Sequence, residues 1–311
     1  MAALLQHALK PNLVQSLEGN PALLHGGPFA NIAQGTNTLL ATRLGMSLAD
    51  YVVTEAGFGF DLGGEKFLDI KARQGGLAPR VVVLVATVRA LKYQGGTALD
   101  QLNQPDPEAV GRGRDHLARH LQNVKRFGIT PLVAINPFTH DSEEELQAVE
   151  ALCQSLSVAC ERADAWGQGG AGAEKLAERA VALCEKPSEF KPLYPLTDSV
   201  TAKISTLAQK IYGASEVKYS PEARKHLRQI ARLGERPWGI CMAKTEKSFS
   251  EDPQQKGAPR DHVLHIRAVE MASGAGFLVP IAGSIMRMPG LPKEPAALGI
   301  NLTEEGIEGL F

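Results

Sequence analysis

The sequence has little of what identifies several large classes of protein. Its 311 residues carry a formal net charge of -1, which gives no electrostatic basis for binding nucleic acid or an anionic membrane. No apolar run approaches the roughly 18 residues that a membrane-spanning helix needs. The first residues, MAALLQHALK, lack the basic segment and long apolar core of a secretion signal. We therefore expect a cytoplasmic protein with no nucleic-acid partner and no membrane partner.

Cysteines and aromatic residues are also scarce. The four cysteines, Cys153, Cys160, Cys184 and Cys241, form no CxxC motif and no metal-like spacing, so we expect reduced thiols. Aromatic residues make up only 5% of the chain, and a Trp or Phe beside a glycine cluster is therefore more informative than usual. The P-loop motif GxxxxGK[ST] does not occur in this sequence.

What the chain does contain is an alternation of apolar strands and amphipathic helices, which predicts a doubly wound α/β architecture. The run RVVVLVATVR at 80–89 is apolar without alternation, as in a parallel strand covered on both faces. The expected strands lie at 51–55, 80–89, 129–135, 158–163 and 239–243, with a small sheet formed by two runs within 263–283. The expected helices lie at 31–43, 66–73, 108–127, 141–157, 173–185, 200–212 and 221–233. Asp141 and Glu144 form a capping box for the helix at 141–157.

The stretch YVVTEAGFGFDLGGEKF at 51–67 is the first candidate site. A β-rich apolar run breaks there into glycines, including Gly57 and Gly59, with the acids Glu55 and Asp61 among them. An apolar strand that ends in an acid and a glycine-rich turn often presents a site at the carboxyl edge of a sheet. The alternative is an ordinary strand and tight turn, because glycines have many structural uses.

Three loops, at 55–66, 136–141 and 166–172, are expected at one edge of the sheet if the strands are parallel. Phe138 follows one strand, and Trp166 precedes the glycine-rich turn WGQGGAG. An exposed aromatic ring beside closely approachable backbone can stack on a flat heterocycle. These two residues therefore predict a stacking slot. The alternative for each ring is a lid over the core.

Two further stretches carry weaker signals. In HGGPFANIAQG, Gly26 and Gly27 lead toward Asn31 and an expected helix, whose N-terminal N–H groups favour an anion. A structural turn is the alternative. His25 is a candidate acid–base group or, alternatively, a hydrogen-bonded loop residue. The polar turn 248–252 is a candidate ligand loop or a plain loop.

Several longer blocks resemble one family. They are KPNLVQSLEGNPALLHGGPFANIAQG, DYVVTEAGFGFDLGGEKFLDIKAR, VVVLVATVRALKYQGG, WGQGGAG, QKIYGA, PWGICMAKTEKSFSEDP and the close from MPGLP to GLF. Together they run from end to end of the chain and are similar to formate–tetrahydrofolate ligase, also called formyltetrahydrofolate synthetase.

The resemblance implies a reaction and a fold. The family joins formate to tetrahydrofolate with ATP, giving 10-formyltetrahydrofolate, ADP and phosphate by way of formyl phosphate. It uses Mg²⁺ and a monovalent cation (K⁺ or NH₄⁺) and is usually a homotetramer. The implied fold is a P-loop NTPase-like parallel sheet with two smaller α/β domains. The pterin-stacking pair of the family falls on Phe138 and Trp166, and Glu55 and Asp61 fall where they can face Mg²⁺, phosphate or the cation.

The resemblance also has a large departure. Family members carry roughly as much chain again before the KPNLVQ block, and that part holds the P-loop, so this chain resembles the C-terminal half with an incomplete sheet. The expected domains are 1–125 (remainder of the NTPase-like domain), 126–236 (folate-binding) and 237–311 (C-terminal). A split enzyme completed by an N-terminal P-loop-bearing polypeptide, a decayed or truncated product and an isolated fragment all fit. The alternative function is a non-catalytic folate-binding or assembly fragment. Smaller departures are Phe60 and Gln34, where the family usually has Ala and His; Phe60 is expected to narrow the glycine loop.

Overall fold

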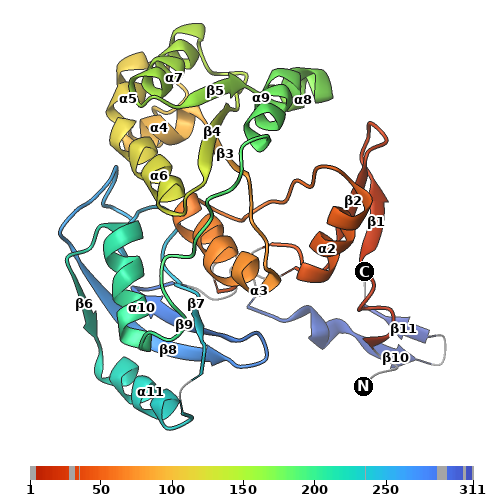
Figure 1. The fold of residues 1–311 in the computed structure, drawn as a ribbon, viewed down its shortest axis with the longest axis vertical. Helices are drawn as coiled ribbons and strands as arrows, with labels where there is room; N and C mark the ends of the chain where they lie inside the picture. The colour runs from red at the N-terminus through yellow and green to blue at the C-terminus, as the bar shows by residue number, and fades with distance from the viewer. Residues whose placement is uncertain are drawn as a thin grey trace.

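The computed structural model describes residues 5–27, 32–34, 36–234, 236–285, 293–303 and 306–309. They form a mixed α/β structure with a three-stranded sheet, a four-stranded sheet and two two-stranded hairpins (Figure 1). The α/β fold class predicted from the alternation is therefore confirmed. Within the described residues, no helix is long and apolar enough to cross a membrane.

The three-stranded sheet is parallel, in the order β3-β4-β5. Its strands are β3 (Val81–Ala86), β4 (Thr130–Ile135) and β5 (Ala159–Arg162). The helices that follow these strands are α4 (Val88–Gln94), α5 (Pro107–Arg112), α6 (Arg114–Arg126), α7 (Glu143–Ser155), α8 (Ala165–Gln168), the 3₁₀ helix η3 (Gly169–Ala173) and α9 (Glu174–Cys184). Each strand lies within its predicted range, between helical segments. β3 and β4 are apolar runs, whereas β5, which reads ACER, ends in two charged residues.

One face of β3 differs from the prediction. The run was expected to be covered on both faces, yet Val83 is 41% and Val85 62% exposed. β3 lies at the end of the described sheet and has only β4 as a neighbour. The side chains of Leu84 and Ala86 pack toward α4, α6 and α7, whereas the opposite face is left partly open. An apolar strand with no alternation therefore has one of its two faces uncovered here.

The four-stranded sheet has the order β6-β8-β9-β7. Its strands are β6 (Glu216–Tyr219), β7 (Gly239–Ile240), β8 (Val263–Ala272) and β9 (Phe277–Ala282). β8 and β9 are antiparallel, while β6 pairs with β8 and β7 with β9 in parallel. Helices α10 (Val200–Leu207), η4 (Ala208–Tyr212) and α11 (Pro221–Ala231) precede or flank these strands. The predicted small sheet within 263–283 is confirmed.

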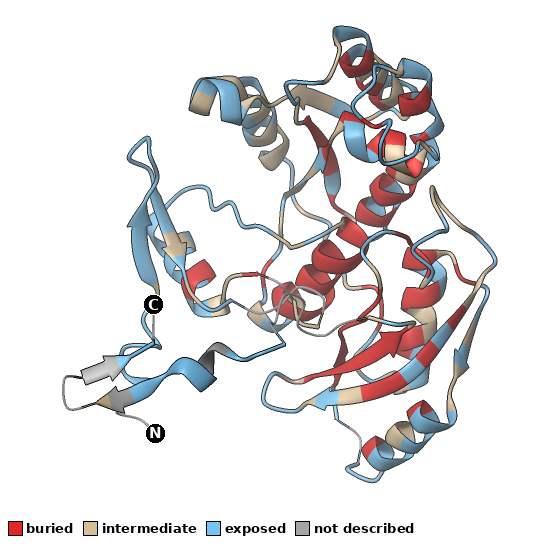
Figure 2. Cartoon of the chain, turned by 180° about the vertical axis from the view of Figure 1, so that it is seen from behind, coloured by how far each residue is buried: buried red, intermediate tan, exposed pale blue. Residues whose placement is uncertain are grey.

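A helical segment from residue 60 to 75 lies at the centre of the molecule. It consists of η1 (Phe60–Gly64) and η2 (Phe67–Ala72), both with π-helical hydrogen bonding, and α3 (Arg73–Gly75). Figure 2 shows it buried between the two sheets. Phe60 and Leu68 belong to the same hydrophobic cluster as Leu278 of β9. The predicted helix at 66–73 is therefore confirmed, and it starts six residues earlier.

The remaining elements lie at the edge of the molecule. They are the hairpin β1 (Asn12–Gln15) and β2 (Pro21–Leu24), helix α2 (Leu39–Leu48), η5 (Ala296–Gly299) and the hairpin β10 (Asn301–Thr303) and β11 (Gly306–Glu308). The β1–β2 hairpin is almost entirely exposed (Figure 2).

Four sequence predictions need correction. Residues 51–55 were expected as a strand but run extended and exposed, without strand pairing. The helix expected at 31–43 begins at Leu39, because Thr38 caps it by accepting a hydrogen bond from Ala41 N. The helix expected at 108–127 is broken at Gly113. The capping box lies one residue later than predicted, on Ser142 and Glu145.

The expected domain boundaries fall inside packed regions. β3, from the first expected domain, pairs with β4 from the second. The central helix shares hydrophobic clusters with all three expected domains. The division at 125 and 236 therefore remains a prediction about the chain and not a visible break in the core.

Candidate functional site

Two aromatic side chains lie at one edge of the parallel sheet. Phe138 follows β4 and Trp166 follows β5, and the last residues of these two strands, Ile135 and Arg162, are paired in register. The loops at 136–141 and 166–172 therefore share an edge, as predicted from the strand alternation. Phe138 is 56% exposed and Trp166 87% exposed. Neither ring is a lid over the core, and both are available to stack on a flat ligand.

Local hydrogen bonds hold each aromatic residue in a defined turn. Phe138 N donates to Asp141 Oδ2 (2.9 Å), and Asp141 N donates to the Phe138 carbonyl (2.9 Å). Asp164 caps the short helix that carries Trp166 by accepting from Gly167 N (2.9 Å). These bonds fix the backbone on which the two rings are mounted while leaving the rings free.

A distant residue joins the Trp166 loop. Glu18, at the tip of the β1–β2 hairpin, accepts a hydrogen bond from Gly170 N at 2.7 Å. A Cβ atom on Gly169 or Gly170 would lie only 2.5 or 2.6 Å from the Glu18 carboxylate. The glycines therefore allow this close approach. Sequence reasoning missed Glu18 because it lies 152 residues from Gly170, and no local pattern signals the pairing.

The glycine stretch at 57–64 packs tightly against the start of the central helix. A Cβ atom on Gly63 would lie 1.7 Å from the Gly57 carbonyl oxygen, and one on Gly59 would lie 2.7 Å from Asp61 Oδ1. Between Gly57 and Gly59, Phe58 has a φ of 63° and is 52% exposed. A positive φ is costly for a non-glycine residue. The sequence analysis did not single out Phe58, although its position between two glycines was the signal.

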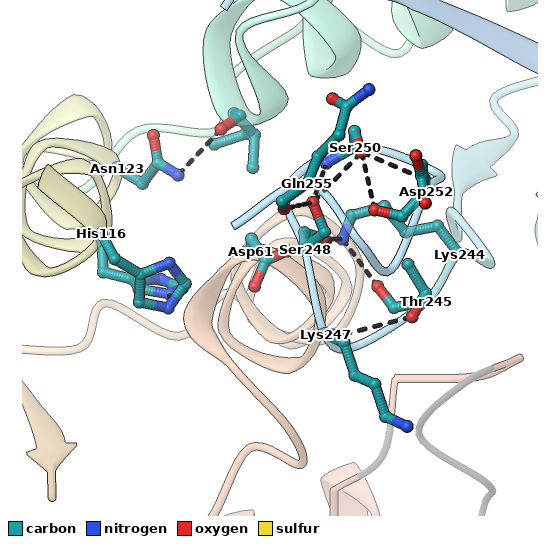
Figure 3. A network of polar contacts seen from close by, with 12 residues as sticks. Asp61, His116, Asn123, Lys244, Thr245, Lys247, Ser248, Ser250, Asp252 and Gln255 are labelled. Atoms are coloured by element: carbon teal, nitrogen blue, oxygen red, sulfur yellow. Dashed lines mark hydrogen bonds and ion pairs between the residues drawn. The ribbon is translucent and has the colours of Figure 1, made fainter. Parts of the chain in front are cut away.

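The two acids of this stretch have different surroundings. Glu55 is exposed on the extended segment 51–57. Asp61 is 4% exposed, and its Oδ2 lies 2.8 Å from Lys244 Nζ. Both residues are labelled in Figure 3. The two acids therefore differ: Asp61 is committed to Lys244 in the interior, whereas Glu55 is open to solvent. The segment 51–57 is also not a strand of the β3-β4-β5 sheet, so the 55–66 loop is not placed at that sheet's edge by strand pairing, contrary to the prediction.

Lys244 uses all three of its donors inside the protein. Besides Asp61, its ammonium group donates to the carbonyls of Thr245 (2.9 Å) and Ser248. Burial lowers the pKa of Lys244, and Asp61 opposes that shift. For Asp61, burial alone would raise the pKa, but Lys244 and His120 bring it below the ordinary value of 3.8. Both groups are therefore charged partners at neutral pH.

Two histidines of α6 lie beside this ion pair. His116 Nδ1 lies 3.0 Å from the Gly257 carbonyl, so this nitrogen carries the proton, and His120 Nε2 must donate to His116 Nε2 at 3.1 Å. Burial lowers the pKa of both rings, and that of His120 falls to about 3. The pair is neutral at physiological pH, and it fixes α6 against the 257 turn.

The polar turn at 248–252 satisfies its own hydrogen bonds. Ser248 Oγ donates to the Gln255 carbonyl (2.6 Å), and Ser250 N donates to Ser248 Oγ (3.0 Å) (Figure 3). Ser248 and Ser250 are 2% and 1% exposed. Of the two readings of this stretch, the geometry fits the plain loop.

The glycine turn at 26–27 lies close to the N-terminus of α2. His25 Nε2 lies 2.8 Å from the Ala8 carbonyl and Nδ1 2.8 Å from Thr38 Oγ1, so His25 is a hydrogen-bonded loop residue. Gly26 has a φ of 73°, and among the described residues, which exclude 28–31, nothing lies within 4 Å of a Cβ built on Gly27. Asn31 lies outside the described residues.

Metal binding by protein side chains alone finds no support in the part of the chain that the structure describes. No group of three or more His, Cys, Asp or Glu side chains there is arranged to hold a metal ion. Mg²⁺ commonly keeps one or two carboxylates and several substrate phosphate oxygens as ligands. The exposed carboxylate of Glu55 suits that kind of shared coordination.

Comparison with known proteins gives a consistent family match. The family model described as formate–tetrahydrofolate ligase matches residues 1–311. A protein named formate–tetrahydrofolate ligase from Arthrobacter sp. (strain FB24) is 51% identical over 314 residues. Those of the same name from Maricaulis maris (strain MCS10) and Staphylococcus aureus (strain NCTC 8325 / PS 47) are 52% and 49% identical. Each match covers 100% of this chain and 56% of the relative. The chain thus spans about half the length of the curated relatives it matches.

Proposed function

The chain belongs to the formate–tetrahydrofolate ligase family, and we propose that it supplies the folate-binding part of an enzyme that joins formate to tetrahydrofolate with ATP. The proposed products are 10-formyltetrahydrofolate, ADP and phosphate, with formyl phosphate as the intermediate. The observation that carries the proposal is the pair of exposed rings, Phe138 and Trp166, at the ends of two adjacent parallel strands.

In this proposal the pterin ring of tetrahydrofolate lies between Phe138 and Trp166. Offset stacking between aromatic faces contributes about 0.5–1.5 kcal/mol beyond area burial. The hydrogen bonds at Asp141 and Asp164 support the slot by holding the backbone of each loop. We expect the slot to hold the pterin while its p-aminobenzoyl-glutamate tail extends along the protein surface.

The phosphate chemistry requires groups that the described site does not offer. Formation of formyl phosphate needs positive charge on the transferring phosphoryl group. Lys66 of the 55–66 loop and Lys244 beside Asp61 are both fully buried, and the Lys244 ammonium is committed to Asp61 and two carbonyls. We propose that an N-terminal P-loop-bearing polypeptide supplies this charge, together with Mg²⁺ and a K⁺ or NH₄⁺ ion. We also propose that the assembled enzyme is a homo-oligomer, namely a homotetramer.

Glu55, Gly57 and Gly59 keep a proposed role at the junction with that polypeptide. Glu55 is exposed, and the extended segment at 51–57 includes Val53, which is 96% exposed. Val85 on β3 presents a second exposed apolar side chain. Apolar side chains exposed on extended backbone are suited to pairing with another strand. We propose that the partner adds strands here, which places its phosphate-binding loop against Glu55. We propose that Gly26, Gly27 and Asn31 line the nucleotide site at this junction. Asp61, buried below the glycine stretch at 57–64, is proposed to support the same site.

A second candidate function is a folate-binding module without ligase activity. The specific observation in its favour is that the stacking slot has both of its rings, whereas the cations nearest Asp61 are buried. This alternative predicts folate binding without ATP turnover, with or without a partner.

The deciding experiment is a coupled assay for 10-formyltetrahydrofolate. It is run with this chain alone, with the P-loop half of a full-length relative alone, and with the two together, supplied with formate, tetrahydrofolate, Mg-ATP and K⁺. We expect product only from the mixture. Folate binding without product in any arm would favour the binding module. The absence of both folate binding and product in every arm would refute both functions.

A further inference from the structure

A buried arginine outside the folate slot has no anionic partner. Arg119, on α6, is 8% exposed, and within the described part of the chain it forms no ion pair or hydrogen bond; its guanidinium lies 5.8 Å from the ring centre of Phe249. Guanidinium groups stay charged, and a buried charge is costly unless it is paired. The other partly buried arginines, Arg73 and Arg162, both have carboxylate partners.

The backbone around Arg119 is built to admit its side chain. Gly213 ends η4 with a φ of 76°, and a Cβ atom there would lie 2.2 Å from Arg119 Nη1. Any other residue at this position would displace the guanidinium. The Gly213 carbonyl accepts from Asp261 N at 2.9 Å, and the His262 carbonyl accepts from Ser215 N at 2.9 Å. These two bonds hold the turn at 260–262 against the backbone at 213–215, which Arg119 contacts at Gly213.

The α6 helix is itself fixed at this point. Asn123, one turn after Arg119, donates from Nδ2 to the carbonyl of Ile211 in η4 (3.1 Å) (Figure 3). Arg119 therefore projects from a helix that is anchored to the same η4 segment that Gly213 ends. The position of its guanidinium is determined by packing and does not depend on an ion pair.

The groups around Arg119 add positive charge and unused donors. Burial lowers the pKa of Arg119, and the charges of Arg260 and Arg126 lower it further. Both ring nitrogens of His262 are buried and have no hydrogen-bond partner in the described part of the chain. The pKa of His262 is lowered by burial and by Arg119, while Glu251 and Asp261 act against that shift.

The carboxylates nearby do not neutralise this cluster. Glu251 accepts hydrogen bonds from His265 N and His265 Nδ1, and Asp61 is paired with Lys244. Asp261 is exposed at a backbone φ of 56° and, among the described residues, forms no ion pair with Arg119 or Arg260. The cluster therefore holds more positive charge than the protein compensates.

We propose that Arg119, Arg260 and His262 form a binding site for a doubly charged phosphate oxyanion. Arg119 supplies a fixed, planar pair of donors, which suits a phosphate bound through two parallel hydrogen bonds. Arg260 contributes a second charge from the exposed side. His262 contributes a ring N–H that has no hydrogen-bond partner among the residues that the structure describes. The two positive charges of Arg119 and Arg260 are balanced by a doubly charged ligand, whereas a ligand with one carboxylate would balance only one of them. The proposal stands independently of the ligase activity, because it concerns binding to this chain alone.

The test measures phosphate binding by the whole chain with isothermal titration calorimetry and thermal unfolding. Sodium phosphate is compared with sodium chloride at matched ionic strength, with ADP without metal and sodium formate as further arms. We expect phosphate to raise the unfolding temperature more than chloride, and formate to have little effect. Tighter binding of ADP than of phosphate would assign the site to a nucleotide phosphate, and the reverse would assign it to free phosphate.

Arg119→Met keeps much of the side-chain volume and removes the charge. It is expected to weaken phosphate binding at least about tenfold, since a charge-assisted hydrogen-bond pair is lost. The matched control is Arg114→Met, on the exposed side of the same helix, which should bind within about twofold of the original chain. Arg119→Met should also be more stable than the original chain without phosphate, because it removes an unpaired buried charge.

If Arg119→Met fails to fold, Arg260→Ala decides the question, since Arg260 is exposed and its loss does not threaten the fold. Weaker phosphate binding by Arg260→Ala would support the site. The proposal is overturned if phosphate stabilises the original chain no more than chloride does, or if Arg119→Met or Arg260→Ala binds phosphate as tightly as the original chain.

Discussion

The ring of Phe60 occupies the space that a side chain on Gly64 would need. A Cβ atom on Gly64 would lie 2.4 Å from Phe60 Cδ2. Phe60 is 5% exposed and packs edge to face on Phe127, with ring centres 5.9 Å apart. Its ring therefore points into the core and also lies against Gly64 of the glycine stretch. That Phe60 narrows the glycine loop remains a prediction.

This relationship predicts that substitutions at the two positions are coupled. Gly64→Ala should cost about 1–3 kcal/mol of unfolding free energy in the original chain, because it forces the ring of Phe60 to move. In a Phe60→Ala background the same change should stabilise by up to about 1 kcal/mol, since alanine is the better helix former and the clash is gone. A double-mutant cycle by urea unfolding measures the coupling. An equal effect of Gly64→Ala in both backgrounds would contradict it.

Glu65 and Asp69 predict an unusual dependence of stability on pH. Burial and the neighbouring Asp69 raise the pKa of Glu65 well above its ordinary value of 4.5, and burial raises that of Asp69 to about 6. A carboxyl whose pKa is raised by folding stabilises fully below its unfolded pKa, and this stability is lost as the pH rises through its folded pKa. The unfolding free energy should therefore fall as the pH rises from about 4 to above 6.

Glu65→Gln is expected to flatten that pH dependence. It should be more stable than the original chain at mildly alkaline pH, by on the order of 1–3 kcal/mol, and lose this advantage below pH 4.5. Urea unfolding across the pH range measures it. Glu185→Gln, at an exposed position, is the matched control and should follow the original chain at every pH.

The ion pair of Asp61 and Lys244 predicts the opposite pH dependence: its contribution to stability is lost as the pH falls. Asp61→Asn leaves the Lys244 charge buried without its partner and should cost about 3–5 kcal/mol. Because the pKa of Asp61 is lowered below 3.8, the ion pair stabilises fully above that pH and its contribution disappears as the pH falls through the folded pKa.

The stability difference between Asp61→Asn and the original chain therefore depends on the pH of the measurement. The difference in unfolding free energy should be largest near neutral pH and shrink under strongly acidic conditions. Asp115→Asn, on the exposed surface of α6, serves as the control with little effect. If Asp61→Asn unfolds at the same urea concentration as the original chain at neutral pH, Asp61 has no such structural role.

Substitution of Trp166 is expected to reduce the affinity for tetrahydrofolate. Trp166→Ala should weaken tetrahydrofolate binding by at least about tenfold, because one face of the proposed stack is lost. Trp166→Phe should retain part of the affinity. Calorimetry measures both. Trp238→Phe, a change at a 5% exposed tryptophan, should leave the affinity unchanged, and unchanged binding by Trp166→Ala would refute the stacking slot.

Glu18 predicts a link between the β1–β2 hairpin and the Trp166 loop. Glu18→Ala removes the acceptor of Gly170 N and should speed hydrogen exchange of that amide by roughly 5-fold or more. Glu18→Gln keeps an oxygen acceptor and should restore most of the protection. Exchange of Gly170 N at the same rate in Glu18→Ala and the original chain would show that the contact does not persist in solution.

Strands and helices with strong local patterns were predicted well from the sequence. The apolar runs of β3 and β4 and the 3.6-residue spacing of α6 are local signals. Phe138 and Trp166 were placed at one sheet edge because the alternation of strands and helices implies parallel pairing. Residues 51–55 have the same local signal but no partner strand in the described chain, so their β-propensity has no sheet to join. Propensity alone does not form a strand.

The buried charges could not be predicted in the same way. Asp61 stands among glycines and was expected to face Mg²⁺, phosphate or the cation. Its ion pair with Lys244 was not predicted, because Lys244 lies 183 positions further along the chain. The unpaired state of Arg119 depends on Gly213 and the 260–262 turn, which become its neighbours only on folding. In the sequence, Arg119 is one of several bases in the expected helix at 108–127, and no local pattern sets it apart from the others.

The central helix has a consequence for the order in which the protein can fold during synthesis. Its residues leave the ribosome early, yet Ile70 packs in a cluster with Phe277 and Ile281 of β9, more than 200 residues later. Contacts of such high sequence separation form slowly, and an apolar helix that waits for them is exposed to aggregation. The first two hundred residues therefore cannot bury this helix when they emerge, and completion of the core must wait until β9 has been made.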